Sequence, residues 1–220
     1  MRRKHEQSLI DLFVKHLHRV GSLNGRNTYQ FSLDGQDAIL GADYIFTTDT
    51  SFVLVEFKYE ELDLPSEGKK ELRKLMCELL SEDYKALDKS LMCHFVAWSK
   101  KQETRELYFN RYYPEICNQK IFPGSMLLAD NKDSSGRMYA DILITDFLNG
   151  IVGANFNVFK QYTDWLLSLG ETGDGGIEVM LDNPETNQLE IIEFSDLDML
   201  NDWLIKNDPS SAPSSSYDPW

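Results

Sequence analysis

The sequence has little of what would tie it to a secreted or membrane-bound class of protein. It holds 3 cysteines in 220 residues, and Cys77, Cys93 and Cys117 are widely spaced and form no CxxC pair. We therefore expect neither a disulfide framework nor a zinc knuckle, and predict reduced, mostly structural thiols. No apolar run approaches the roughly 18 residues of a membrane-spanning helix, and no signal-peptide core follows the charged start of the chain. These absences predict a cytoplasmic protein without a membrane partner.

Motifs for several common catalytic mechanisms are also missing. The chain contains no GxSxG nucleophile elbow, no GxxxxGK[ST] phosphate-binding loop and no HExxH zinc motif. Any catalysis must therefore use other side chains than these motifs supply.

Basic residues are scarce in the second half of the chain. The formal net charge is −14, but residues 1–120 hold 18 Lys+Arg against 19 Asp+Glu, which gives −1. Residues 121–220 hold 4 Lys+Arg against 17 Asp+Glu, which gives −13. The first half can engage phosphates, whereas the second half would repel them unless it faces away or meets a basic protein partner.

The composition that is present fits an ordinary folded protein. Hydrophobic residues make up 42% of the chain and aromatic residues 12%, which is enough to bury a core without staples. We predict a core domain over residues 1–120 and an acidic region over 121–207 that is packed on the core or appended to it. The Ser/Pro-rich tail over 208–220 is expected to be flexible.

Hydrophobic spacing in the first half predicts a helix, three strands, a second helix and a further strand. Between His5 and Val20 apolar residues recur every three or four positions, which is typical of a helix with one buried stripe. Two short apolar runs, 44–46 and 52–55, flank a polar turn and predict a β-hairpin. The remaining predicted elements are a strand at 28–33, a helix at 67–82, a buried strand at 91–98 and a strand at 105–110.

The second half predicts two helices, a second hairpin and a third helix. The helices cover 138–148 and 156–169, and the hairpin strands cover 177–181 and 189–194. Ser195 is the predicted N-cap of the third helix, with Asp198 in the capping-box position.

Three ionisable residues of the first hairpin form the candidate site. Asp43 opens its first strand, and Glu56-Phe57-Lys58 ends the second. Because side chains alternate along a strand, Glu56 and Lys58 are expected on one face, with Asp43 beside them. Two carboxylates are oxygen donors that Mg²⁺ prefers, and Lys58 could stabilise developing charge, hold a water or help remove its proton.

Four more residues extend this candidate site, each with an alternative. Glu6 lies on the buried stripe of the first helix, where it either adds an outer-sphere or second-metal ligand or remains a solvated first-turn residue. Lys70, Arg73 and Lys74 are expected on the face of the 67–82 helix opposite its apolar residues. They form either a solvated basic face or a patch that contacts nucleic-acid phosphates.

Asp43, twelve intervening residues and Glu56-Phe57-Lys58 at the end of an apolar strand resemble the PD-(D/E)xK motif of the restriction-endonuclease-like superfamily. The resemblance covers roughly residues 5–110, where the predicted elements are similar to the αβββαβ core of that superfamily. Asp43 matches the first acid of the motif, Glu56 the second acid and Lys58 the lysine. Glu6 is similar to the first-helix glutamate of many members, and Ala42 stands in place of the motif's proline.

The resemblance implies an α/β protein with a mixed sheet, a restriction-endonuclease-like core and an acidic helical and β-hairpin C-terminal extension. It implies a Mg²⁺-dependent or Mn²⁺-dependent nuclease whose metal ligands are Asp43 and Glu56. DNA is the expected substrate ahead of RNA, in phage defence, mobile elements or repair, and many members act as homo-oligomers. The alternative is a non-catalytic interaction protein that keeps the nuclease-like core and binds a basic partner through its acidic half.

Overall fold

The chain forms two compact units, Met1–Gly175 and Gly176–Trp220. The computed structural model describes residues 5–33, 36–48, 50–129, 134–170, 177, 179–182 and 191–207.

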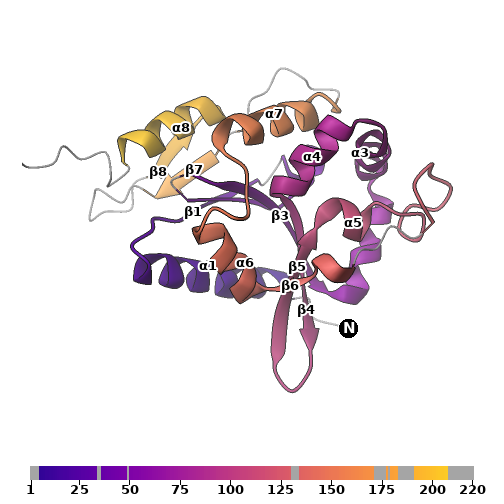
Figure 1. The fold of residues 1–220 in the computed structure, drawn as a ribbon, viewed down its shortest axis with the longest axis horizontal. Coiled ribbons are helices and arrows are strands. Elements are labelled where there is room, and N and C mark those ends of the chain that lie inside the picture. Colours follow the sequence, from indigo (N-terminus) through magenta and orange to yellow (C-terminus); the bar gives the residue numbers. More distant parts are fainter. Residues whose placement is uncertain are drawn as a thin grey trace, which may run out of the picture. The chain divides into compact units, whose positions relative to one another are not determined.

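A six-stranded mixed sheet is the centre of the first unit (Figure 1). The strands lie side by side in sequence order, and every neighbouring pair is antiparallel except β3 and β4, which are parallel. The predicted mixed α/β fold is therefore confirmed. The strands are β1 (Tyr29–Ser32), β2 (Tyr44–Thr47), β3 (Phe52–Glu60), β4 (His94–Lys101), β5 (Arg105–Arg111) and β6 (Met138–Tyr139).

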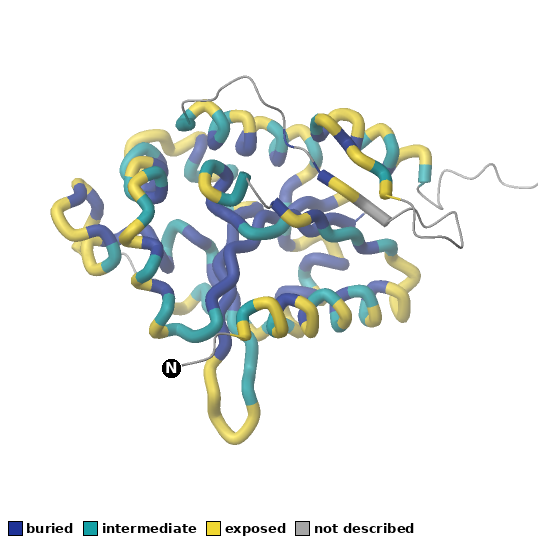
Figure 2. Tube along the Cα trace, turned by 180° about the vertical axis from the view of Figure 1, so that it is seen from behind, coloured by how far each residue is buried: buried dark blue, intermediate teal, exposed yellow. Residues whose placement is uncertain are grey.

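Helices cover both faces of this sheet. One face packs against α1 and α6, and the other contacts η1, α4, α5 and α7. Because the strands pass between these two layers, their central residues are buried, as Figure 2 shows. The α-helices of the unit are α1 (Glu6–Leu23), α2 (Asp37–Leu40), α3 (Glu71–Glu82), α4 (Tyr84–Cys93), α5 (Tyr112–Ile116), α6 (Ala140–Leu148) and α7 (Phe156–Leu167), and the 3₁₀ segments are η1 (Glu61–Lys69) and η2 (Ser134–Gly136).

Aromatic rings join α1 to the sheet. Phe13 of α1 packs against Phe46, Phe57 and Phe109, with ring centroids 5.3, 5.9 and 5.1 Å away. Burial of each such ring stabilises the fold by about 1.5–3 kcal/mol relative to an exposed ring. Since Phe57 faces α1, its neighbours in β3 must face the opposite layer.

Two predicted boundaries in the first half are wrong. The helix expected at 67–82 is split into η1 and α3, because Lys70 between them has an extended backbone. The strand expected from Leu91 begins at His94, because residues 84–93 form α4. Asp83 starts that helix by accepting hydrogen bonds from the backbone N–H groups of Lys85 and Ala86.

The acidic region predicted over 121–207 spans both units. Leu143, Ile144 and Phe147 of α6 belong to the same hydrophobic core as Phe13. Phe159 of α7 stacks on Phe52 of β3, with ring centroids 5.2 Å apart. Residues 140–167 are therefore part of the first unit and complete its core on both faces of the sheet.

The expectation of three reduced cysteines is wrong. Cys77 of α3 and Cys117, which follows α5, form a disulfide with their Cα atoms 5.1 Å apart, whereas Cys93 is free and buried. The two cysteines are 40 residues apart in the sequence, so only the packed fold shows that their side chains meet. Disulfides are typical of oxidising compartments, and the cytoplasmic location stays a prediction.

The second unit is a hairpin followed by a helix. Strands β7 (Val179–Asp182) and β8 (Ile191–Phe194) pair antiparallel, as predicted, and α8 (Leu197–Lys206) follows them. The predicted N-cap is wrong by one residue, since Asp196 and not Ser195 accepts the hydrogen bond from the Met199 N–H. The predicted flexible tail at 208–220 lies outside the described residues. Within those residues, no helix has both the length and the apolar character needed to cross a bilayer.

His94 is a buried, neutral histidine of the core. Its Nε2 donates to the Gly41 carbonyl at 2.8 Å, so its Nδ1 accepts from the Tyr162 hydroxyl at 2.9 Å. Its ring also stacks on Tyr112 at 4.4 Å. Burial lowers the pKa of His94 from 6.5 to about 3. The unfolded chain therefore binds a proton more readily, and folding stability is lost as the pH falls below 6.5.

We expect the unfolding free energy of the wild type to fall by about 2 kcal/mol between pH 7 and pH 5, because His94 gains a proton only in the unfolded chain. Urea unfolding of the wild type and His94→Gln across this range measures the effect, since glutamine cannot gain the proton. The pH profile of the variant should be flatter by that amount. Parallel profiles would show that His94 titrates normally in the folded protein.

Candidate active site

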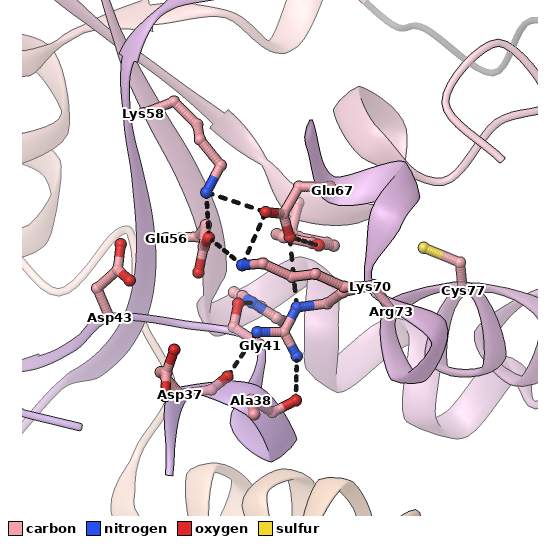
Figure 3. Close-up of polar contacts among 12 residues, drawn as sticks. Asp37, Ala38, Gly41, Asp43, Glu56, Lys58, Glu67, Lys70, Arg73 and Cys77 are labelled. Atoms are coloured by element: carbon pink, nitrogen blue, oxygen red, sulfur yellow. Dashed lines mark hydrogen bonds and ion pairs between the residues drawn. The ribbon is translucent and has the colours of Figure 1, made fainter. Parts of the chain in front are cut away.

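Strand β3 brings together the three residues predicted from the motif (Figure 3). The prediction that Lys58 ends this strand is wrong, since β3 continues to Glu60. Glu56 and Lys58 point to the face opposite Phe57, and both are buried. Asp43, at the start of β2, accepts a hydrogen bond from the Phe57 N–H at 2.6 Å through its Oδ2. The predicted alternation is therefore confirmed, and the backbone of β3 itself fixes the Asp43 carboxylate beside Glu56.

Glu67 is a fourth member of the site that the sequence analysis missed. It lies in η1 and is fully buried. Its Oε1 lies 2.9 Å from the Nζ atoms of both Lys58 and Lys70. Its Oε2 accepts from the Tyr112 hydroxyl at 2.7 Å and from Arg73 Nε at 3.3 Å. This carboxylate therefore holds the cations that surround Glu56.

The three bases predicted on one exposed face of α3 have different environments. Lys70 is half-buried, and its Nζ lies 2.9 Å from Glu56 Oε1. Arg73 is only 1% exposed and donates to the carbonyls of Asp37 and Ala38 at 2.5 and 2.9 Å. The expectation of an exposed, phosphate-contacting Arg73 is wrong, because its donors are used inside the protein. Lys74 is half-buried, and its proposed contact with phosphate stays a prediction.

Glu6 lies at the same end of β3. Its Oε2 accepts a hydrogen bond from the Tyr59 N–H at 3.1 Å, which ties the first turn of α1 to the strand. The carboxylate thus points toward the sheet, in line with its place on the buried stripe. Its predicted role as an outer-sphere or second-metal ligand remains a prediction.

Burial and charge shift the pKa values of the site residues in opposite directions. Burial, followed by the negative charge of Glu67, raises the pKa of Glu56 to about 7. Burial also raises the pKa of Asp43. For Glu67 burial acts in the same direction, but the charges of Lys58, Lys70 and Arg73 outweigh it and lower its pKa. Glu56 and Asp43 are therefore the carboxylates that gain most from an additional positive charge.

Burial disfavours the charged form of Lys58, yet its pKa is raised. Glu56 and Glu67 both attract the Lys58 ammonium, and their charges exceed the effect of burial. Lys58 is therefore protonated at neutral pH. In this state it can donate hydrogen bonds and offset negative charge, but it cannot accept a proton.

The carboxylates of Asp43 and Glu56 have a donor set that fits a divalent cation. Glu56 Oε2 is buried and has no hydrogen-bond partner in the described part of the chain, whereas its Oε1 contacts Lys58 and Lys70. Figure 3 shows this second oxygen on the side of Glu56 that faces Asp43. The described residues contain no ready cluster of three or more His, Cys, Asp or Glu side chains around a metal position. The protein thus offers two carboxylates, and lysine ammonium groups occupy the other side of Glu56.

No protein-family model, curated protein or solved structure matches the chain.

Proposed function

We propose that the chain is a nuclease that hydrolyses phosphodiester bonds of DNA, or secondarily RNA, with Mg²⁺ or Mn²⁺. The observation that carries this proposal is the buried Glu56 Oε2, which has no hydrogen-bond partner among the described residues and lies on the side of Glu56 that faces Asp43. A carboxylate oxygen that is buried without a partner is costly, and a cation between Glu56 and Asp43 would give Oε2 that partner. Asp43 and Glu56 would hold that cation.

The arrangement of elements supports a restriction-endonuclease-like core. From α1 the chain passes through β1, β2 and β3, then through η1, α3 and α4, and returns to the sheet as β4, parallel to β3. This order agrees with the αβββαβ order of that core, and α2 and α4 are additional helices. Glu56 and Lys58 lie on β3 with Asp43 beside them, which is in line with the motif.

Each residue of the site has a defined task in this proposal. A bound divalent cation would polarise a phosphodiester oxygen and position the attacking water. Lys58 remains protonated and stabilises negative charge that develops on the phosphate. Glu67 positions the Lys58 ammonium, and Arg73 and Tyr112 in turn position Glu67. The alternative in which a bound metal lowers the Lys58 pKa, so that Lys58 helps to remove a proton, stays a prediction.

The direct test is a cleavage assay with the purified full chain. Supercoiled plasmid, linear duplex, single-stranded DNA and RNA are incubated with Mg²⁺ or Mn²⁺, with EDTA as the control. We expect metal-dependent cleavage of at least one substrate, with DNA cut faster than RNA. If none of the four substrates is cut with either cation, the proposed nuclease function is wrong.

A second candidate function rests on the composition of the second unit. Residues 176–220 hold 1 Lys+Arg against 10 Asp+Glu, so their formal charge is −9. Apolar side chains are exposed in the same unit, on both strands and on the helix: Met180, Ile191, Met199 and Ile205. An acidic surface with exposed apolar residues suits a basic amphipathic partner, so this unit could bind such a protein without catalysis.

Removing residues 176–220 separates the two candidates. Because contacts group residues 1–175 into a compact unit of their own, we expect the truncated chain to unfold within a few degrees of the full chain. It should lose binding to a synthetic basic amphipathic peptide, measured by fluorescence anisotropy at low salt. It should also cut DNA faster, since the acidic unit no longer repels phosphates. Unchanged peptide affinity would exclude this unit as the basic-partner site.

A further inference from the structure

Two lysines share the same oxygen of Glu56 but differ in their exposure. Lys58 and Lys70 both contact Glu56 Oε1, and both lie 2.9 Å from Glu67 Oε1. The Lys58 side chain is 10% exposed, whereas that of Lys70 is 38% exposed. The two ammonium groups thus have the same partners, and Lys70 has the easier route to solvent.

When all three carboxylates are ionised, the charges of the site are balanced without a metal. The carboxylates of Asp43, Glu56 and Glu67 face the cations of Lys58, Lys70 and Arg73. A divalent cation that entered beside Glu56 would leave an excess of two positive charges at short range, which a partly buried site opposes. Binding is therefore easier if one resident cation moves away.

Lys70 is the resident cation that can move. Arg73 is 1% exposed and is held by Glu67 and by two backbone carbonyls, and Lys58 is buried on strand β3. Lys70 instead precedes α3 with an extended backbone, at the junction with η1. Turning its side chain outward breaks two ion pairs but leaves the other contacts of the site in place.

We propose that Lys70 is an exchangeable counter-cation of this site. It neutralises Glu56 and Glu67 while no metal is bound, and it leaves Glu56 when a divalent cation binds. Its freed ammonium then contacts a phosphate of the nucleic acid, so that metal binding and substrate binding favour each other. This inference rests on the proposed nuclease function and adds the order in which the site is loaded.

Calcium affinity tests the first half of the inference. Isothermal titration of Ca²⁺ is performed with the full-length wild type, Lys70→Gln, Lys70→Arg and Lys69→Gln, because Lys69 is an exposed neighbour with the same charge. We expect Lys70→Gln to bind Ca²⁺ roughly tenfold more tightly, while Lys70→Arg and Lys69→Gln stay near the wild type. Equal affinities for Lys70→Gln and Lys69→Gln would overturn the inference. Lys70→Ala serves as a second variant if circular dichroism shows that Lys70→Gln is misfolded.

The salt dependence of DNA binding tests the second half. Affinity for a fluorescein-labelled duplex is measured against salt concentration, with Ca²⁺ and separately with EDTA. With Ca²⁺, Lys70→Gln should reduce the salt slope by about one relative to the wild type, because one phosphate contact is lost. With EDTA the two slopes should be equal. If Lys70→Gln reduces the salt slope equally with Ca²⁺ and with EDTA, Lys70 contacts phosphate whether or not a metal is bound. That result would overturn the proposed exchange of Lys70 for the metal.

The variant Glu56→Gln separates a failure of this inference from a failure of the proposed function. If Glu56→Gln binds Ca²⁺ as well as the wild type, the cation does not bind at Glu56 and the proposed function fails as well. If Glu56→Gln abolishes Ca²⁺ binding while Lys70→Gln leaves it unchanged, only the role of Lys70 is rejected.

Discussion

Replacing Glu56 with glutamine is expected to reduce DNA cleavage by about 10³-fold or more, because the variant loses a metal ligand and thus several kcal/mol of transition-state stabilisation. The substitution keeps the shape of the side chain in a site where Glu56 is 1% exposed. Folding should be little affected, since the cost of burying the Glu56 carboxylate and the gain from its ion pairs largely offset each other. Initial rates of plasmid cleavage and urea unfolding measure the two effects.

The matched control for this prediction is Glu82→Gln, which removes one exposed carboxylate at the end of α3. It should cut DNA at the wild-type rate. If Glu56→Gln retains more than about a tenth of wild-type activity, a group other than Glu56 holds the metal and the assignment of the site is wrong.

The residues of the motif were predictable because their placement depends on local geometry. Alternation along β3 puts Glu56 and Lys58 on one face, and the hairpin puts Asp43 beside them whatever the rest of the chain does. The order of the helices and strands followed from the same hydrophobic patterns, and the mixed sheet was implied by the resemblance to the restriction-endonuclease-like core. These parts of the site need only neighbouring residues to form, and the sequence contains all of them.

Glu67 was missed because its place in the site depends on how η1 folds back over the sheet. The sequence did hold one signal, since Lys70 follows Glu67 by three residues, a spacing that allows an ion pair along a helix. The prediction instead oriented the 67–82 helix with its apolar residues toward the core and its basic residues toward solvent. Met76 and Leu80 are buried, so the apolar stripe of α3 does face the core. Arg73 lies on this same buried face and is 1% exposed, because Glu67 and two backbone carbonyls hold its guanidinium inside the protein.

Contacts between residues far apart in the sequence account for the other differences. The pairing of Cys77 with Cys117 depends on the packing of α3 near α5, which no spacing rule reveals. The incorporation of α6 and α7 into the first unit depends on apolar contacts with Phe13 and Phe52. The acidity of residues 121–220 therefore did not mark a structural boundary, because the charged residues of α6 and α7 lie on the surfaces of helices whose apolar faces complete the core.

Replacing Glu67 with alanine is expected to destabilise the fold by about 3–5 kcal/mol, the largest stability effect of any substitution in the site. The variant removes the only carboxylate among the described residues that contacts the buried Arg73. It also removes a partner of Lys58 and the acceptor of the Tyr112 hydroxyl. Urea unfolding at pH 7 measures the loss, and Glu71→Ala, an exposed carboxylate on α3, should cost less than about 1 kcal/mol.

The pH dependence of this effect identifies its electrostatic part. The three surrounding cations lower the pKa of Glu67 below its usual value of 4.5, despite burial. The unfolded chain therefore protonates this group first, so its contribution is fully present above pH 4.5 and is lost as the pH falls below that value. The difference between the wild type and Glu67→Ala should accordingly shrink as the pH falls below 4.5. A difference that stays constant below pH 4 would mean that the alanine variant is destabilised by the cavity it leaves rather than by the uncompensated charge of Arg73.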